Sequence, residues 1–187
     1  MELLKKISSS SSNRLIILEG PDGAGKTTLA SKLAKQLNFK LYHFSSDEDL
    51  DSVSLKNKYT QKLNNLNSNF IFDRSWFSET PYGTIHRNLS RLDSSAIARL
   101  ESLCIPFDPI VVVCLPSLTQ ILHNFKTRFN QEYLNCETEL IDIYDWYSKF
   151  TTSLPSLVYN FEIETFENLC LNLKALNNVY YHEGPPC

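Results

Sequence analysis

The chain has 187 residues, of which 42% are hydrophobic and 21% are charged, and its formal net charge is −3. These values are typical of an ordinary globular protein, and they argue against a basic nucleic-acid-binding surface as its main function. The longest apolar run, about seven residues, is far shorter than the roughly 20 that cross a membrane, so no membrane partner is expected.

Residues 1–13 are expected to form a flexible leader, because their serine tract offers little to bury. Residues 14–187 are expected to form a single domain. The five cysteines show no CxxC spacing and fit a reducing compartment. The four histidines are isolated, so no metal site can be read from them. A cytoplasmic location follows as an expectation, in the host cell if the protein is viral.

Apolar runs of strand length alternate with longer helical patterns along the whole chain. The β-rich runs predict strands at 14–19, 39–44, 69–73, 109–115 and 157–163. Apolar residues at helical spacing predict helices at 27–37, 53–66, 76–89, 94–104, 117–129, 137–150 and 165–176. Strands separated by helices need crossover connections, so we expect a three-layer α/β/α fold around a five-stranded parallel sheet.

The stretch "GPDGAGKT", residues 20–27, matches the GxxxxGK[ST] pattern between an apolar strand and a helical pattern. Its glycines allow successive N–H groups to point at phosphate oxygens. Lys26 would reach the β and γ oxygens of ATP, and the Thr27 hydroxyl would ligate Mg²⁺. ATP phosphates are therefore expected at Gly20, Asp22, Gly23, Ala24, Gly25, Lys26, Thr27 and Thr28.

The phosphate loop alone does not identify the class of NTPase. A guanine-nucleotide switch needs NKxD and DxxG motifs, but "NKYT" lacks the aspartate and "DRSW" lacks the glycine. A motor or AAA-type ATPase is typically longer, with an apolar run that ends in a DE pair. The small size and the missing motifs favour a kinase of small molecules.

A second motif, "FIFDRSWFSETPYG", occupies residues 70–83 at the end of the third predicted strand. Ligands of doubly wound sheets bind outside the carboxyl ends of the strands, so Asp73 and Arg74 are expected beside the phosphate loop. Asp73 would hold Mg²⁺ or accept a proton. Arg74 would bind an acceptor phosphate through a bidentate contact.

The stretches "LEGPDGAGKTTLASKLA", "FDRSWFSETPYG" and "VVVCLPS" resemble the thymidylate kinase-like family of nucleoside monophosphate kinases, especially its compact bacteriophage members. The resemblance covers most of residues 14–163. It implies ATP- and Mg²⁺-dependent phosphorylation of a deoxynucleoside monophosphate, with dTMP or a related pyrimidine as the best guess, to the diphosphate. It also implies a homodimer.

The same resemblance implies roles for substrate-binding residues. Asp22 would approach the 3′-hydroxyl of the acceptor sugar, and Ser78 and Tyr82 fall at the serine and tyrosine of the DRYxxSxxxY pattern. Glu79 would contact the base or the sugar. The acceptor base is expected to stack on Tyr82, Phe44 or Trp76, of which Trp76 is expected in the core or an interface instead. Adenine is expected in a slot around residues 161–166.

Two departures from the family pattern matter. Gly23 stands where some members carry an arginine that neutralises the transferring phosphoryl group, so a mobile helical lid at about 123–137 must supply that charge. Lys126 and Arg128 are the candidates, and the sequence leaves both open. The REPGGT-like stretch that helps to read thymine is absent after the second strand, which leaves the base open.

"DRSWFSE" also resembles the ERSxxSD stretch of deoxynucleoside kinases, which phosphorylate a 5′-hydroxyl. That reaction benefits from a general base near the end of strand two, where Asp47 and Glu48 lie. The short chain, the in-loop Asp22 and the absence of an EPxxxW-type stretch favour the monophosphate kinase. A regulatory ATP-binding protein and a kinase of modified bases in DNA are further alternatives. The net charge disfavours a nucleic-acid partner.

Overall fold

A computed structural model of the protein describes residues 13–45, 49–128, 134 and 136–182. Its centre is a five-stranded parallel sheet with the strand order β2-β3-β1-β4-β5. The strands are β1 (Leu15–Glu19), β2 (Lys40–His43), β3 (Phe70–Asp73), β4 (Ile110–Cys114) and β5 (Ser156–Tyr159). The parallel sheet expected from the alternating pattern is confirmed.

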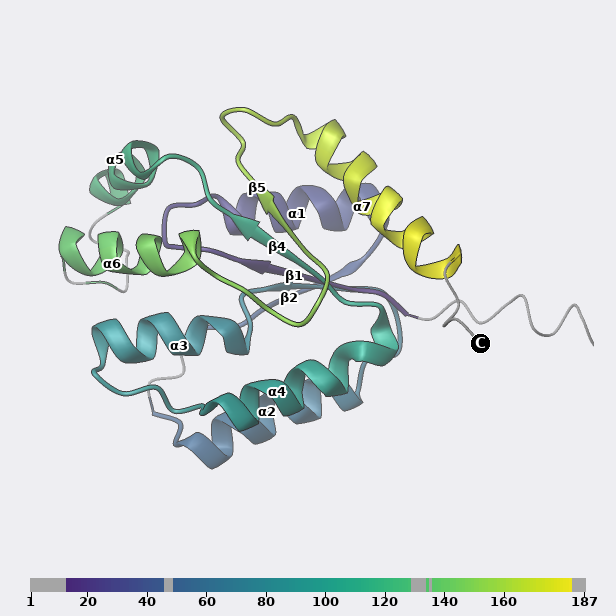
Figure 1. The fold of residues 1–187 in the computed structure, drawn as a ribbon, viewed down its shortest axis with the longest axis horizontal. Helices are drawn as coiled ribbons and strands as arrows, with labels where there is room; N and C mark the ends of the chain where they lie inside the picture. Colours follow the sequence, from purple (N-terminus) through teal and green to yellow (C-terminus); the bar gives the residue numbers. More distant parts are fainter. Residues whose placement is uncertain (1–12, 46–48, 129–133, 135, 183–187) are drawn as a thin grey trace, which may run out of the picture.

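Helices cover both faces of this sheet (Figure 1). On one face lie α1 (Lys26–Leu37) and α7 (Phe166–His182). On the other lie α2 (Ser52–Asn64), α3 (Glu79–Pro81) and α4 (Ser94–Cys104). Beyond the ends toward which the strands point lie α5 (Leu118–Arg128) and α6 (Glu137–Ser148). The three-layer α/β/α fold is therefore also confirmed.

The three central strands form the core of the molecule. Every residue of β1, β3 and β4 is buried, as expected for strands that are covered on both faces. The edge strands β2 and β5 expose several of their residues. Among the described helices, none is long and apolar enough to cross a membrane.

Three predicted elements differ from the structure, and the first is the last helix, which extends to His182 instead of ending at residue 176. The fifth strand ends at Tyr159 instead of residue 163, because the Asn160 carbonyl accepts bonds from the Ile163 and Glu164 amides and closes a turn. The helix predicted at 76–89 is a succession of η1 (Trp76–Ser78), α3 and the π-helical η2 (Tyr82–His86). Pro81 has no N–H to continue a regular helical ladder, which accounts for the change of pattern.

The strand order places the ends of β1, β2 and β3 at one edge of the sheet. Asp73 on β3 is in register with Leu18 on β1 and with His43 on β2. From the neighbouring strands β1 and β3 the chain continues in opposite directions, to β2 and to β4, and such a switch point opens a crevice at the carboxyl ends of the strands. The expected leader, except residue 13, and part of the expected lid at about 123–137 lie outside the described residues.

Candidate active site

The phosphate loop occupies the turn between β1 and α1. Gly20 has φ 137°, and a Cβ atom there would lie 2.3 Å from the Cys114 carbonyl oxygen on β4, so only glycine fits. Lys26 Nζ donates hydrogen bonds to the carbonyl oxygens of Gly20 (2.8 Å) and Pro21 (2.6 Å). Burial, assisted by the charge of Arg74, lowers the pKa of Lys26 to about 8. The loop thus holds a buried amine that anionic oxygens would keep charged.

Asp73 lies directly beside the start of α1. Its Oδ2 atom accepts a hydrogen bond from Thr27 Oγ1 at 2.7 Å and lies 2.9 Å from His43 Nδ1. Its Oδ1 atom is buried and has no hydrogen-bond partner among the described residues. A hydroxyl beside a carboxylate with an unused oxygen is an oxygen donor set of the kind that Mg²⁺ prefers. Thr27 and Asp73 therefore fit the metal that the phosphate loop implies.

Arg74 reaches from the end of β3 to the phosphate loop. Its backbone is left-handed (φ 71°), an uncommon conformation for a residue other than glycine, and its Nη2 atom donates to Asp22 Oδ1. The guanidinium carbon lies 5.0 Å from the centroid of the Tyr82 ring. Burial would raise the pKa of Asp22, but the charges of Arg74 and Lys26 outweigh it and hold that pKa below its usual range. Asp22, Arg74 and Tyr82 are therefore brought together.

A carboxyl group that the motifs did not single out lies beneath this cluster. Glu19, the last residue of β1, is fully buried and accepts hydrogen bonds from Ser75 Oγ (2.7 Å), Ser78 Oγ (2.7 Å) and Tyr147 Oη (2.8 Å). Burial raises its pKa, although the three hydroxyl bonds oppose the change. The signal in the sequence was an acidic residue at the end of an otherwise apolar strand, directly before the loop.

Two aromatic residues that were options for stacking with the base are buried in the structure. Phe44 is 2% exposed and packs against the rings of Tyr42, Tyr59 and Phe72, so it belongs to the core and presents no open stacking face. Stacking of a base on Phe44 would require this aromatic cluster to open. Trp76 is also fully buried.

Glu79 holds the segment that follows η2. Its carboxylate accepts bonds from Arg87 Nη2 (2.6 Å) and from the Arg91 backbone N–H, Nε and Nη2, each at 2.9 Å. Arg91 Nη1 also donates to the Leu50 carbonyl oxygen. Glu79 therefore connects the segment after η2, and through Arg91 the loop at Leu50, while the substrate contact expected of Glu79 stays a prediction.

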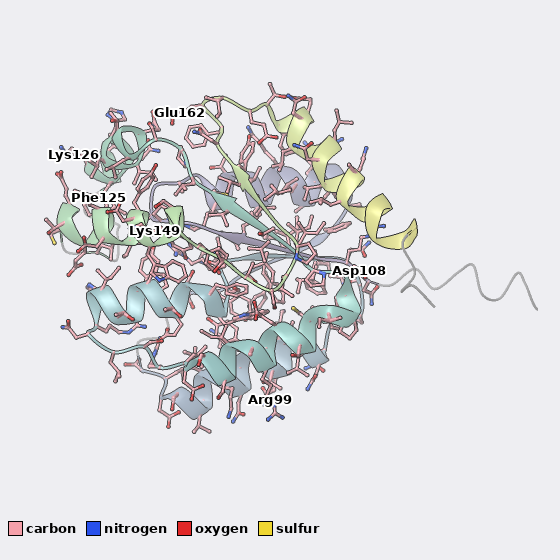
Figure 2. All side chains as sticks on the ribbon, viewed as in Figure 1. Arg99, Asp108, Phe125, Lys126, Lys149 and Glu162 are labelled. Carbon is pink, nitrogen blue, oxygen red and sulfur yellow. The ribbon has the colours of Figure 1, made fainter. Side chains whose placement is uncertain are left out.

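The predicted lid cations are only partly described. Lys126 forms an ion pair with Glu137 (3.4 Å), and its side chain is 62% exposed. Figure 2 shows Lys126 at the end of the molecule where α5 and α6 lie. The side chain of Arg128 lies outside the described part of the chain, as do Asp47 and Glu48. The choice between Lys126 and Arg128 stays a prediction.

A cleft of about 510 Å³ opens on the other side of the loop. Thr28 at the start of α1, Asn124 on α5, and Phe161 and Thr165 after β5 contribute to its walls. The cleft lies where the slot for adenine was expected, next to the phosphate loop.

The glycine loop, the buried lysine and the parallel sheet together define a P-loop domain with a nucleotide-kinase-like fold. The sequence model of the family described as "Rad17 P-loop domain" matches residues 2–103, which is more than half of the chain, and the chain belongs to that family. The match ends before β4, so α5, α6, β5 and α7 lie outside it. No curated protein sequence matches the chain significantly.

Solved structures resemble the chain over most of its length. The YorR protein of Bacillus subtilis, in complex with phosphorylated GDP, has a TM-score of 0.72 and 21% identity over 91% of this chain and 99% of that one. Deoxyadenosine kinase from M. mycoides, with bound dCTP, has a TM-score of 0.60 and 19% identity over 88% and 99%. Thymidylate kinase from Candida albicans has a TM-score of 0.55 and 16% identity over 94% and 96%. At these identities the likeness establishes the fold.

Proposed function

We propose that the protein transfers the γ-phosphoryl group of ATP to the phosphate of a deoxynucleoside monophosphate, with dTMP or a related pyrimidine nucleotide as the first candidate. The observation that carries this proposal is the position of Arg74, whose guanidinium bonds to Asp22 in the phosphate loop. Arg74 is a second cation close to Lys26, with a side chain that is largely out of water, and its charge lowers the pKa of Lys26. Two neighbouring cations suit two phosphate groups, one on the donor and one on the acceptor.

The two cations have separate tasks in this reaction. Lys26 and the loop amides hold the β and γ phosphates of ATP. Arg74 holds the acceptor phosphate, whose oxygen attacks the γ phosphorus while the bond to the β–γ bridging oxygen breaks. The products are ADP and the deoxynucleoside diphosphate. The acceptor is already an anion, so this chain needs no strong base, and its contribution is positioning and charge neutralisation.

Thr27 and Asp73 would hold Mg²⁺, which, when bound, neutralises charge on the phosphate oxygens. Asp22 and Tyr82, both in contact with Arg74, would lie near the acceptor sugar. The cleft beside Phe161 and Thr165 would take the adenosine part of ATP, with the exposed Phe161 ring as a surface for the base.

The assignment to the compact, bacteriophage type of thymidylate kinase-like enzymes is part of this proposal, as are a homodimer and a cytoplasmic location. The kinases among the solved structures, which include thymidylate kinase and deoxyadenosine kinase, support phosphoryl transfer to a nucleotide or nucleoside as the general chemistry. Sedimentation of the purified chain tests the dimer, and a monomer at micromolar concentration would contradict it.

A deoxynucleoside kinase is the second candidate, and the position of His43 favours it. His43 ends β2 and lies 2.9 Å from Asp73, at the strand end where a general base for a 5′-hydroxyl is expected. One structural neighbour is a deoxyadenosine kinase. In that case His43 or Asp73 would take the proton that the 5′-hydroxyl loses.

A coupled assay of ADP release separates these candidates. The acceptors are dTMP, dUMP, dCMP, dGMP, dAMP and the free nucleosides, including modified pyrimidines. We expect a monophosphate to be the best acceptor and Lys26→Ala to abolish turnover. Higher turnover with nucleosides selects the second candidate, and ADP release that responds to no acceptor contradicts both.

The variant Arg74→Ala tests the proposed acceptor site. It should raise the KM for the monophosphate by about a hundredfold, which corresponds to about 2.7 kcal/mol, and should change the KM for ATP much less. Arg99→Ala is the matched control, because Arg99 is exposed on α4 (Figure 2) and should leave both values unchanged. An equal effect of Arg74→Ala on both substrates would contradict the assigned role.

A further inference from the structure

The tip of the phosphate loop is in direct contact with α5. Gly23 has φ 78°, and a Cβ atom there would lie 3.1 Å from the Ile121 carbonyl oxygen and 3.2 Å from the Asn124 Cβ atom. Any larger residue would therefore push against the backbone of α5. The contact explains why this loop position, which carries an arginine in some thymidylate kinase-like proteins, holds glycine in this chain.

One side chain of α5 bonds to this tip. Asn124 Nδ2 donates a hydrogen bond to the Gly23 carbonyl oxygen at 2.8 Å. Asn124 Oδ1 accepts a bond from Gln120 Nε2, one helical turn earlier, also at 2.8 Å. Both ends of the Asn124 amide therefore have partners, and the partner at Oδ1 fixes which end of the amide faces the loop.

The bond to Gly23 determines where the next amide of the loop points. The Gly23 carbonyl and the Ala24 N–H belong to one trans peptide unit, in which these two groups point in opposite directions. With the carbonyl directed outward to Asn124, the Ala24 N–H points into the loop. There it makes only a long bond, 3.3 Å, to the Pro21 carbonyl oxygen.

Asn124 is itself held on a fixed element. The first turn of α5 is fastened by Glu162, whose carboxylate accepts bonds from the Ser117 backbone N–H and from Ser117 Oγ. Figure 2 shows Glu162 near α5, at the turn that follows β5. Phe125, the neighbour of Asn124, is fully buried and anchors the helix in the core. These contacts let α5 present the Asn124 amide to the loop in one position.

We propose that Asn124 is a positioning residue, which holds the Gly23–Ala24 peptide so that the Ala24 N–H is ready to bind a nucleotide phosphate. The inference rests on the proposed function only in requiring that the loop bind nucleotide phosphates. It also links the phosphate loop to α5, whose second half belongs to the lid expected at about 123–137. A prearranged donor binds more tightly because less ordering is needed at the moment of binding.

Asn124→Ala tests this role, with calorimetric titration of ADP and of a nonhydrolysable ATP analogue as the measurement. We expect nucleotide affinity to fall about three- to tenfold, the range for the loss of one hydrogen bond. In Asn124→Asp, which keeps the shape of the side chain but has no N–H to donate, nucleotide affinity should fall at least as far. Thr119→Ala is the matched control, because Thr119 is exposed on the same helix and should bind as the wild type does.

A readout at the loop itself separates positioning from general stability. In ¹H–¹⁵N spectra, the Ala24 amide of the wild type should shift strongly on addition of ADP, and in Asn124→Ala this shift should be smaller and need more ADP. Equal affinity and equal shifts in the two proteins would overturn the inference and leave the proposed function intact. Failure of the wild type to bind any nucleotide would overturn both.

Discussion

Arg74 and Asp22 form an ion pair that joins the segment after β3 to the phosphate loop. The Asp22 side chain is 6% exposed and that of Arg74 is 20% exposed, so the pair lies largely out of water. The backbone of Arg74 is left-handed (φ 71°), and its side chain reaches the loop. The pair therefore connects the phosphate loop (residues 20–27) with the second motif (residues 70–83), which lie far apart in the sequence.

Replacing Asp22 by asparagine should leave the charge of Arg74 buried without its counter-ion. We expect the free energy of unfolding to fall by about 3 kcal/mol, the lower end for a broken buried pair, because Arg74 is partly exposed. Urea denaturation measures the change. Lys126→Ala, which breaks the exposed pair with Glu137, is the control and should cost less than about 1 kcal/mol. Equal losses of unfolding free energy in the two variants would contradict the conclusion that burial makes the Asp22–Arg74 pair more important than the exposed pair.

Nucleotide binding should take up protons in mildly alkaline solution. The pKa of Lys26 is about 8, so above that pH much of the free protein carries a neutral amine. Bound phosphate oxygens favour the charged form and raise this pKa. Titration calorimetry in buffers of different ionisation enthalpy measures the protons taken up on binding. We expect clear proton uptake at pH 8.5 and much less at pH 7. Lys35→Ala, an exposed change on α1, should behave as the wild type, and zero uptake at pH 8.5 would refute the prediction.

The titration of Glu19 should be visible in the stability of the protein. Burial raises its pKa above the ordinary value of 4.5, so the folded protein binds this proton more tightly than the unfolded chain. The stability that the bound proton confers is present below pH 4.5 and is lost as pH rises through the folded pKa. Glu19→Gln removes this loss, so its stability relative to the wild type should improve from pH 4.5 toward neutrality.

Urea denaturation across this pH range measures the effect at Glu19. Ser78→Ala is an informative partner variant, because it removes a hydroxyl that opposes the rise in pKa. Ser78→Ala should therefore raise the pKa of Glu19 further, so that stability continues to fall up to a higher pH than in the wild type. Parallel pH profiles for the wild type and Glu19→Gln would mean that Glu19 does not titrate differently in the folded protein.

Two glycines of the loop should respond differently to alanine. At Gly20 a Cβ atom would meet the Cys114 carbonyl oxygen at 2.3 Å, so Gly20→Ala should cost about 3 kcal/mol or more of stability. At Gly25 the nearest atom would be on the Phe161 ring at 3.5 Å, an ordinary contact. Gly25→Ala should therefore cost only the strain of its left-handed backbone, about 1–2 kcal/mol. Thermal unfolding of both variants is the check, and the reverse order would contradict the packing of the loop on β4.

Removal of Mg²⁺ should weaken ATP binding through Thr27 and Asp73. We expect EDTA to lower the affinity of the wild type for ATP roughly tenfold, or about 1.4 kcal/mol, and to have little further effect on Thr27→Ala. Ser31→Ala, one helical turn later on α1 and exposed, is the control and should keep the full dependence. Calorimetric titration with and without Mg²⁺ gives the comparison. An unchanged metal effect in Thr27→Ala would remove Thr27 from the metal site.

The sequence by itself determined the phosphate loop and the parallel sheet, and it predicted that ligands bind at the carboxyl ends of the strands. These features depend on short-range patterns: apolar strands, helical spacing, and glycines at positions that need unusual backbone angles. The placement of Asp73 and Arg74 beside the loop followed as well, because the carboxyl ends of parallel strands share one edge. The same local patterns placed the end of β5 four residues too late, because the turn at Asn160 depends on a backbone bond.

Only the tertiary structure decided which polar groups meet. Glu19 bonds to Tyr147, 128 residues away, and Asn124 bonds to Gly23, 101 residues away. Glu79 forms ion pairs with two arginines of the following segment, and Phe44 packs in the aromatic core. Such pairings are set by the order of the strands and the docking of α5 and α6, and no periodicity in the sequence encodes them. The loop could therefore be recognised from its own residues, whereas the contacts that hold it in shape could not.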